Sequence, residues 1–218
     1  ERDGGGHDLR HRGGISLIPY ARVNSAWTIN DGFMRAVYGQ MVRERTLETT
    51  FYANSVPDGD EFLAILQRTE NLPVVAFDDR ELAGLAWINA IKSDHAFAHY
   101  WFARGVWGRR SVEVAKEILD YWFRFDKDND ALFKVLLGET PANNRRAAAF
   151  NKRIGFTEVG TVPKVSGSGV TIFYLENPNG KEFWQQQERA ESSSIGTGES
   201  GADSAGHAET LAETAGHR

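Results

Sequence analysis

Apolar residues recur along the middle of the chain at spacings that match the α-helical period. Around 33–41 the large apolar side chains lie one or three residues apart, which places them on one helix face: Phe33, Met34, Val37, Tyr38 and Met41. Asn30 or Asp31 stands just before them, where a side-chain oxygen caps unpaired N–H groups. The pattern therefore predicts a helix that begins at one of these two residues.

The same reasoning predicts three more helices. A short one follows Asp58, with Glu61 three residues later as in a capping box. A longer one, at about 110–125, buries one apolar stripe and exposes a polar face. Its stripe consists of Ala115, Ile118, Leu119, Trp122 and Phe123. The last helix, 144–153, ends before Gly155.

Between the helices lie short runs rich in β-branched and aromatic residues, which predict strands. These runs are 15–20, 72–77, 82–91, 96–102, 132–137, 156–162 and 170–174. The polar stretch at 78–81 joins the second and third runs as a hairpin. Its second strand is apolar on both faces, as a central strand is. The order β-α-α-β-β-β-α-β-α-β-β predicts a mixed α and β domain.

Composition changes sharply at both ends of the chain. Residues 1–14 hold five of the 22 glycines, and residues 192–218 hold five more with only Ile195 and Leu211 as large apolar groups. Such segments have too little apolar area to offset the entropy of ordering. We therefore expect a disordered segment at 1–14, one domain at 15–185 and a disordered acidic tail at 186–218.

Charge and residue types exclude several classes of function. The formal net charge of −5 and the near-neutral folded part argue against electrostatic binding to nucleic acid or membranes. No apolar run reaches the ~18 residues of a membrane span. The chain has no cysteine, which removes thiol nucleophiles, disulfides and thiolate metal sites. Absence of cysteine also fits a cytoplasmic protein.

The most informative loop joins the strand at 96–102 to the helix at 110–125. It reads Arg104-Gly105-Val106-Trp107-Gly108-Arg109-Arg110-Ser111. The first N–H groups of a helix lack partners and carry about half a positive charge, which favours a phosphate. The glycine before the helix lets the main chain approach such an anion closely. The loop predicts a diphosphate site, with an ordinary turn carrying solvated arginines as the alternative.

A second segment, at 140–156, has a strand end, a helix and a strand start. It reads Thr140-Pro141-Ala142-Asn143-Asn144-Arg145-Arg146-Ala147-Ala148-Ala149-Phe150-Asn151-Lys152-Arg153-Ile154-Gly155-Phe156. Together the two segments resemble the GNAT superfamily of acyl-CoA N-acyltransferases, with Trp107-Gly108-Arg109 on its diphosphate loop and Asn144 and Gly155-Phe156 on its later helix. The resemblance covers about 74–175 and is strongest to the branch that acetylates protein N-terminal amines, including those of ribosomal proteins.

The resemblance implies an α+β fold with a mixed, mostly antiparallel sheet of about six to seven strands and about four flanking helices. It also implies a splay between two central strands, in which acyl-CoA lies. The implied activity is acetyl-CoA-dependent transfer of an acyl group to a primary amine, on a protein N-terminus or a small molecule, by direct attack in a ternary complex. The alternative is a catalytically lapsed acyl-CoA-binding or regulatory module, and a homodimer stays open.

The sequence departs from the family pattern at positions that matter for binding and catalysis. In the diphosphate loop, Gly105 stands at the family's Gln or Arg, and Arg110 stands at its second Gly. In the later helix, Ala147 stands at the family's Ser and Asn151 at its frequent Tyr acid. The family's strand Glu falls near Phe97, so the usual base and the usual acid are both absent.

Acyl transfer therefore needs other groups to move the amine proton and to stabilise developing charge. His99 can accept a proton at neutral pH, because its unperturbed pKa is near ~6.5; a structural histidine is the alternative. Glu139 is a second candidate base or a solvated strand-end carboxylate. Tyr100 and Tyr174 are candidate proton donors or core packing. His95 and His99 lie about 13 Å apart along a strand and cannot share an ion, so we predict no metal.

The family's positions imply the coenzyme contacts. Strand residues pair their main chain with the pantetheine arm, amides at 109–112 hold the diphosphate, and the later helix flanks the adenosine end. The implied set is Phe102, Arg104, Trp107, Gly108, Arg109, Arg110, Ser111, Val112, Asn144, Phe150 and Arg153. A helix cap is the alternative for Asn144. No motif names the acceptor, whose pocket the family builds from about 25–67 and 162–171.

Overall fold

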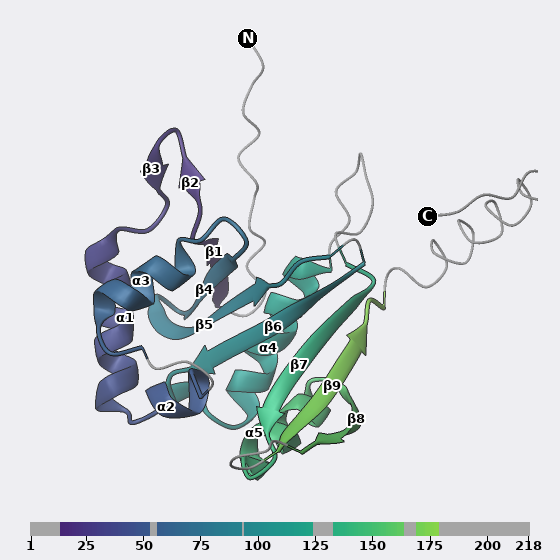
Figure 1. Cartoon of the computed structure of the whole chain (residues 1–218). Coiled ribbons are helices and arrows are strands. Elements are labelled where there is room, and N and C mark those ends of the chain that lie inside the picture. Colours follow the sequence, from purple (N-terminus) through teal and green to yellow (C-terminus); the bar gives the residue numbers. More distant parts are fainter. Residues whose placement is uncertain (1–13, 53–55, 93, 124–132, 164–168, 179–218) are drawn as a thin grey trace, which may run out of the picture. The chain divides into compact units, whose positions relative to one another are not determined.

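A seven-stranded sheet forms the frame of the computed structural model (Figure 1). The structure describes residues 14–52, 56–92, 94–123, 133–163 and 169–178. Of the two segments expected to be disordered, the tail at 186–218 lies outside these ranges, as does the N-terminal segment except for Gly14. No helix in the described ranges is long and apolar enough to cross a membrane.

The sheet is mixed, and its strand order differs from its chain order. Its strands are β1 (Ile15–Pro19), β4 (Leu72–Asp78), β5 (Glu81–Asn89), β6 (His95–Phe102), β7 (Val135–Pro141), β8 (Thr157–Val162) and β9 (Val170–Glu176). They lie in the order β1-β4-β5-β6-β7-β9-β8. Every neighbouring pair is antiparallel except β6 and β7, which are parallel. A separate two-stranded ribbon consists of β2 (Arg22–Val23) and β3 (Ala26–Trp27).

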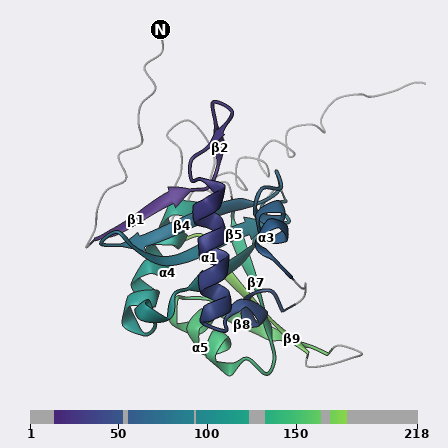
Figure 2. The same cartoon turned by 90° about the vertical axis from the view of Figure 1, so that its left-hand side faces the viewer.

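Helices cover both faces of the sheet (Figures 1 and 2). They are α1 (Asp31–Arg43), α2 (Leu47–Thr50), α3 (Gly59–Leu66), α4 (Arg109–Trp122) and α5 (Arg145–Arg153), with a 3-10 turn η1 (Arg104–Val106) before α4. The first three lie on one face, and α4 and α5 lie on the other. The mixed, mostly antiparallel sheet and its flanking helices confirm the predicted fold class.

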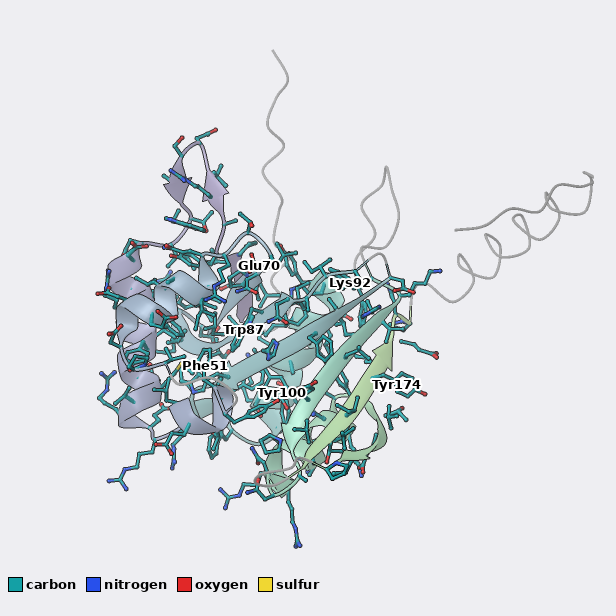
Figure 3. All side chains as sticks on the ribbon, viewed as in Figure 1. Phe51, Glu70, Trp87, Lys92, Tyr100 and Tyr174 are labelled. Atoms are coloured by element: carbon teal, nitrogen blue, oxygen red, sulfur yellow. The ribbon has the colours of Figure 1, made fainter. Side chains whose placement is uncertain are left out.

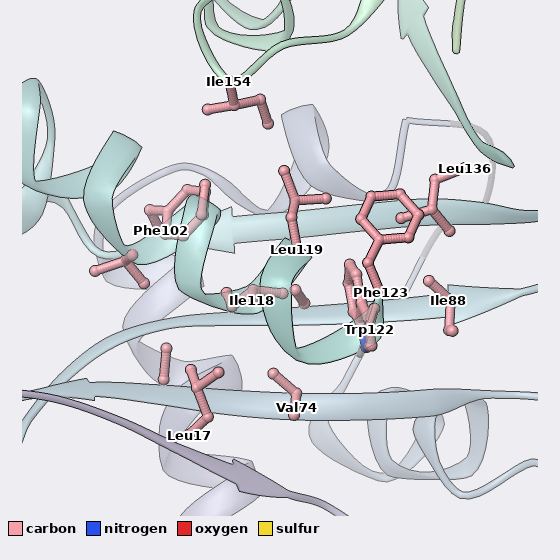
Figure 4. Close-up of a cluster of buried hydrophobic side chains, with 14 of the residues drawn as sticks. Leu17, Val74, Ile88, Phe102, Ile118, Leu119, Trp122, Phe123, Leu136 and Ile154 are labelled. Atoms are coloured by element: carbon pink, nitrogen blue, oxygen red, sulfur yellow. The ribbon is translucent and has the colours of Figure 1, made fainter. Parts of the chain in front are cut away.

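The two faces carry separate cores because strand side chains alternate between them. On β5, Ala86 and Ile88 pack in the core under α4, whereas Leu85 and Trp87 pack in the core under α1 and α3. Figure 4 shows the first core, in which the apolar stripe of α4 rests on the sheet. The stripe predicted from sequence, which includes Ile118, is buried as expected.

Side-chain caps start three of the helices where the sequence predicts. The Asn30 oxygen accepts from the Phe33 N–H at 2.8 Å, which settles the choice between Asn30 and Asp31. Asp58 accepts from two N–H groups of the first turn of α3. Asn144 accepts from the Ala147 N–H at 3.1 Å. Each cap satisfies a donor that the helix cannot pair internally.

Two tight turns place non-glycine residues in left-handed backbone. Asp79 and Arg80 have φ of 47° and 78°, and they join β4 to β5 in the predicted hairpin. Asn24 and Ser25 have φ of 48° and 68° and join β2 to β3. Such turns match the twist of the strands that they connect. The second hairpin is not predicted from sequence because its two-residue strands are too short to show a period.

The strand predicted at 132–137 is wrong in position. β7 starts at Val135 and continues to Pro141, and Leu132 lies outside the described residues. The strand continues because β9 pairs with it along its whole length, from Val135 opposite Glu176 to Pro141 opposite Val170. Glu139 consequently lies within the strand and not at its end.

β6 and β7 are paired over only three residues before they separate. The pairs run from His95 opposite Val135 to Phe97 opposite Leu137. β6 then continues to Phe102 along β5, while β7 continues along β9, and the two strands diverge (Figure 1). The splay implied by the family resemblance is therefore present.

The cores predict the effect of truncating a leucine. Leu85 is 0% exposed and Leu72, on the neighbouring strand, is 42% exposed. Leu85→Ala should lower the free energy of unfolding by about 2–5 kcal/mol, because it removes buried apolar atoms and leaves a cavity. Leu72→Ala should cost well under half as much. Urea unfolding of both variants measures this, and equal losses would contradict the assigned burial.

Candidate active site

The gap between β6 and β7 exposes main-chain hydrogen-bonding groups. The Ala103 N–H donates to the Ala83 carbonyl on β5 at 2.9 Å. Because successive residues of a strand direct these groups to opposite sides, the N–H and C=O of Tyr100 and Phe102 point away from β5 and into the gap. From β7, the Glu139 carbonyl faces the same gap. An extended, amide-containing molecule could pair with such an edge.

A pocket of about 60 Å³ lies in this gap. Segments far apart in the chain meet there: the end of α2 and the residues after it, the middle of β6, β7, one face of α5 and the residue before β8. The lining residues are Thr49, Thr50, Tyr52, Ala98, His99, Tyr100, Gly138, Glu139, Thr140, Pro141, Asn144, Ala147, Asn151 and Phe156. The three predicted catalytic residues, His99, Tyr100 and Glu139, are among them.

His99 is held rigidly on the α1–α3 side of the gap. Its ring stacks on Trp87 with centroids 4.9 Å apart, and Trp87 stacks in turn on Phe51. Its Nε2 lies 3.0 Å from the Asn89 amide oxygen, which requires a hydrogen on Nε2 and leaves Nδ1 as the acceptor. Burial lowers the pKa of His99 to about 4. The imidazole is therefore neutral at pH 7 and able to accept a proton, but it is a weak base.

Glu139 and Tyr52 meet on the same side of the gap. Glu139 has an exposed side chain, and its carbonyl oxygen accepts a hydrogen bond from the Tyr52 hydroxyl at 3.0 Å. Burial, with a smaller effect of the Glu139 charge, raises the pKa of Tyr52 to about 12. Tyr52 thus stays a neutral donor that ties the segment after α2 to β7.

Tyr52 is a site residue that the sequence analysis missed. It belongs to the 25–67 stretch expected to build the acceptor pocket, but no motif marks it. Thr49 and Thr50 reach the pocket from the same stretch. No described residue of 162–171 lines it, and 164–168 lie outside the described residues.

On the α4–α5 side, Tyr100 belongs to a buried polar contact. Its hydroxyl donates to the Asn151 amide oxygen, and the Asn151 amide nitrogen donates to the Thr140 hydroxyl at 3.1 Å. The Tyr100 ring packs against Phe102 and Phe150. Burial raises the pKa of the Tyr100 phenol, so that it keeps its proton.

Tyr174, the other tyrosine proposed as a proton donor, does not reach the pocket. It lies on β9, on the far side of β7 from Tyr100 (Figure 3). Among the described residues, no three His, Asp or Glu side chains gather as metal ligands. His95 instead contacts its neighbour Asp94, with Nδ1 and carboxylate oxygen 2.7 Å apart.

The N-terminus of α4 lies at the open end of the gap, directly after β6 and η1. No side chain caps this helix, in contrast to α1, α3 and α5. Gly108 precedes it with φ of 103°, a backbone that favours glycine, and a Cβ there would enter open space. The Ser111 hydroxyl turns back to the Gly108 carbonyl at 2.9 Å. The first amides of α4 are therefore available to an anion.

The arginines around this helix start are largely paired. Arg110 binds both oxygens of Asp78, with Nε 2.7 Å from one of them, and also binds Glu113 at 2.7 Å. These contacts raise the pKa of Arg110 and turn its guanidinium toward β4. Arg109 pairs with Glu113 at 2.9 Å, and Arg104 lies 5.0 Å above the exposed Trp107 ring. Main-chain amides thus supply much of the positive potential here.

Two main-chain groups expected to pair with the pantetheine arm already have partners. The Phe102 carbonyl accepts from the Trp107 indole N–H at 2.9 Å. The Arg104 N–H donates to the Glu44 carboxylate at 3.0 Å. Tyr100 and Ala98 are then the residues of β6 whose main chain faces the gap at the level of the pocket.

The remaining residues predicted to contact the coenzyme lie on α4 and α5 or just before them. Val112 is in the first turns of α4 and is half-buried. Asn144 caps α5 and also lines the pocket, so both of its expected roles are compatible with its position. Phe150 packs on Phe102, and Arg153 is exposed near the end of α5.

Among comparisons of this chain with known proteins, the search of solved structures finds similar folds. A scan against protein-family models finds no match, and a search of curated proteins finds none. An acetyltransferase from Salmonella typhimurium that modifies the N-terminal serine of a ribosomal protein superposes with a TM-score of 0.59 at 14% identity. The match covers 77% of this chain and 98% of that one.

Two further acetyltransferases match about the same share of this chain. Spermidine N-acetyltransferase from Vibrio cholerae, solved with CoA and spermine, gives a TM-score of 0.59 at 16% identity, over 76% of this chain and 97% of that one. The N-acetyltransferase PseH from Campylobacter jejuni gives 0.51 at 15% identity, over 75% and 98%. These matches show that the chain has the GNAT fold.

The buried imidazole predicts a measurable titration. His99 should titrate near pH 4 in the folded protein, against about 6.5 when unfolded. The unfolded chain then binds more protons between these values, so stability should fall by up to about 3 kcal/mol as the pH drops from 6.5 to 4. NMR titration of the imidazole and urea unfolding against pH measure both effects. In His99→Phe this part of the pH dependence should vanish; a wild-type value near 6.5 would contradict the assignment.

Proposed function

We propose that this chain, which has the GNAT fold, is an acetyl-CoA-dependent N-acetyltransferase that acts on a primary amine. The observation that carries the proposal is the gap between β6 and β7, which opens next to the uncapped N-terminus of α4. The gap offers the main chain of Tyr100 on β6 to an amide-containing arm. The helix start offers amides to a diphosphate. In acetyl-CoA, an amide-containing pantetheine arm is joined directly to a diphosphate, so one molecule can occupy both places.

Each end of acetyl-CoA fits described residues of this chain. The amides of residues 109–112 bind the diphosphate, with Gly108 leaving the space above them open. The main chain of Tyr100 pairs with the pantetheine arm. Phe150 and Arg153, on α5, flank the adenosine end. The coenzyme supplies an acyl group activated as a thioester.

The acceptor amine approaches from the α1–α3 side of the gap. Glu139 and the neutral His99 both lie there, and either can take the proton that the amine loses on attack. The Tyr52 hydroxyl and the threonines at the end of α2 border the same space. A primary amine, from a protein N-terminus or a small molecule, fits this set of acceptor groups.

The identity of the amine and the assembly of the enzyme belong to the same proposal. Among the similar structures, one acetyltransferase modifies an N-terminal serine and another acts on spermidine, and a dodecameric structure is known for the latter. We propose an acceptor of one of these two kinds, a protein N-terminus or a small amine. We also propose a cytoplasmic location, which the cysteine-free sequence suggests, and a homodimer.

A second candidate function is a binding module that retains acyl-CoA but no longer transfers its acyl group. The specific observation that favours it is Asn151, which stands where the family has a tyrosine acid and is occupied by contacts with Tyr100 and Thr140. The low pKa of His99 also makes it a weak base. This module would bind acetyl-CoA and release no CoA.

Calorimetry and a thiol-release assay separate the two functions. Acetyl-CoA should bind with a stoichiometry of one to the purified chain. CoA should then be released on addition of a protein N-terminal peptide or a polyamine. Binding without release for every amine in a broad panel would establish the binding module, and absence of binding would overturn both functions.

The diphosphate site proposed at the start of α4 predicts that alanine substitutions at two nearby glycines differ in their effect on acetyl-CoA affinity. Gly108→Ala should weaken acetyl-CoA binding by about tenfold or more, because the φ of 103° is strained for alanine and the new Cβ enters the diphosphate space. Gly105→Ala is the matched control, since a Cβ there meets nothing and its φ is ordinary. Calorimetry with both variants tests this, and equal affinities would contradict the diphosphate site.

The two candidate bases predict different kinetic losses. If Nδ1 of His99 takes the amine proton, His99→Ala should lower kcat with acetyl-CoA affinity kept, and the loss of wild-type kcat caused by protonation of His99 should lie below about pH 5. Glu139→Gln should then keep most of the turnover. Steady-state kinetics of both variants measures this. Unchanged kcat in His99→Ala with a large loss in Glu139→Gln would assign the base to Glu139.

A further inference from the structure

A chain of side-chain hydrogen bonds spans the gap between β6 and β7. Tyr100 on β6 donates to the amide oxygen of Asn151 on α5, and the amide nitrogen of Asn151 donates to Thr140 on β7 at 3.1 Å. Asn151 is 3% exposed and Thr140 is 4% exposed. Both side chains are therefore almost fully shielded from bulk solvent, and all three residues line the pocket.

The position of Tyr100 along the gap matches the reactive end of the donor substrate. A diphosphate on the start of α4 makes the arm enter the gap at the Phe102 end of β6. The gap closes at the pair of Phe97 and Leu137. Tyr100 lies about 10 Å before that closed end, at ~3.3 Å per residue. The pocket occupies this stretch of the gap and Tyr100 lines it, so we place the sulfur end of the arm beside Tyr100.

We propose that Asn151 is a positioning residue that holds the Tyr100 hydroxyl as hydrogen-bond donor to the sulfur that leaves the acyl group. This inference rests on the proposed function. In the transfer, the amine nitrogen forms a bond to the acyl carbon and the carbon–sulfur bond breaks, with its electron pair going to sulfur. The amine proton passes to the base and solvent. The thiolate is stabilised by the Tyr100 hydroxyl and takes a proton from solvent on release.

The donor and acceptor capacities of the three groups allow this role. The Thr140 hydroxyl can accept or donate, and the Asn151 amide has an acceptor at one end and donors at the other. When the amide turns its nitrogen toward Tyr100, Thr140 donates to the amide oxygen and the phenol hydrogen is free to point at sulfur. The contacts of Asn151 with Tyr100 and with Thr140 are kept in both arrangements. A buried phenol also keeps its proton at neutral pH, so it acts as donor.

The test measures the thiol pKa of CoA bound to the protein. The chain contains no cysteine, so CoA supplies the one thiol of the complex, and subtracting the absorbance of the desulfo-CoA complex at the same pH removes the contribution of tyrosine ionisation. A hydrogen bond from Tyr100 favours the thiolate and lowers this pKa. Tyr100→Phe and Asn151→Leu should each raise it by about one unit, a tenfold change in the ionisation constant. Tyr174→Phe, which changes a tyrosine outside the pocket, should leave it unchanged.

A double variant separates positioning from an independent effect. Because Asn151 acts through Tyr100, Tyr100→Phe with Asn151→Leu should match Tyr100→Phe alone, both in thiol pKa and in kcat. The other titratable groups lining the pocket are Tyr52, His99 and Glu139, and they are the same in every variant. Additive shifts would overturn the positioning role.

The outcomes distinguish this inference from the proposed function. If CoA does not bind to the wild-type chain, the proposed function fails. If CoA binds and all variants share one thiol pKa, the proposed function stands and the role of Tyr100 is overturned. If only Tyr100→Phe shifts the pKa, the sulfur contact stands and the role of Asn151 is overturned. Calorimetric CoA affinity of Asn151→Leu, expected to stay within about threefold, shows that this variant is folded.

Discussion

The separation of β6 from β7 after three residue pairs is the constraint on which the site depends. Each strand is paired along its length on its other side, β6 to β5 and β7 to β9, so neither can bend to follow the other. Strand twist then carries the two halves of the sheet apart. The result is a gap lined by main-chain groups inside an otherwise continuous sheet. A buried polar edge of this kind needs partners, which side chains or a ligand must supply.

The two sides of the gap satisfy that need differently. On the α1–α3 side, the Tyr52 hydroxyl binds a main-chain carbonyl, and the neutral His99 is held by a ring stack and an amide. On the α4–α5 side, Asn151 links Tyr100 to Thr140. The candidate bases His99 and Glu139 thus lie on the first side and the Tyr100 hydroxyl lies on the second, an arrangement that suits an amine arriving from one face and a thiol leaving toward the other.

Local signals in the sequence predict much of the frame. Asn30 and Asp58 act as caps where a side-chain oxygen precedes an apolar period, and Gly108 marks the start of α4, because these effects depend only on neighbours in the chain. The predicted catalytic residues His99, Tyr100 and Glu139 share one pocket because β6 and β7 are neighbours in the sheet, which the family resemblance implies and no local signal shows.

Long-range contacts could not be predicted in the same way. Arg110 is paired with Asp78, 32 residues earlier, and the sequence gives no sign of which direction its side chain takes. Tyr52 reaches Glu139, 87 residues later, from the segment after α2, a helix too short to show a period. The extent of β7 depends on β9, which lies beyond α5 and β8 in the chain. In each case the deciding partner is set by tertiary packing.

A crystal structure of the chain with acetyl-CoA tests the central claim most directly. The account predicts the diphosphate on the amides of residues 109–112, the pantetheine arm along the main chain of Tyr100 and the thioester sulfur beside its hydroxyl. Coenzyme bound elsewhere, or a gap between β6 and β7 that stays bridged by side chains at saturating acetyl-CoA, would contradict it.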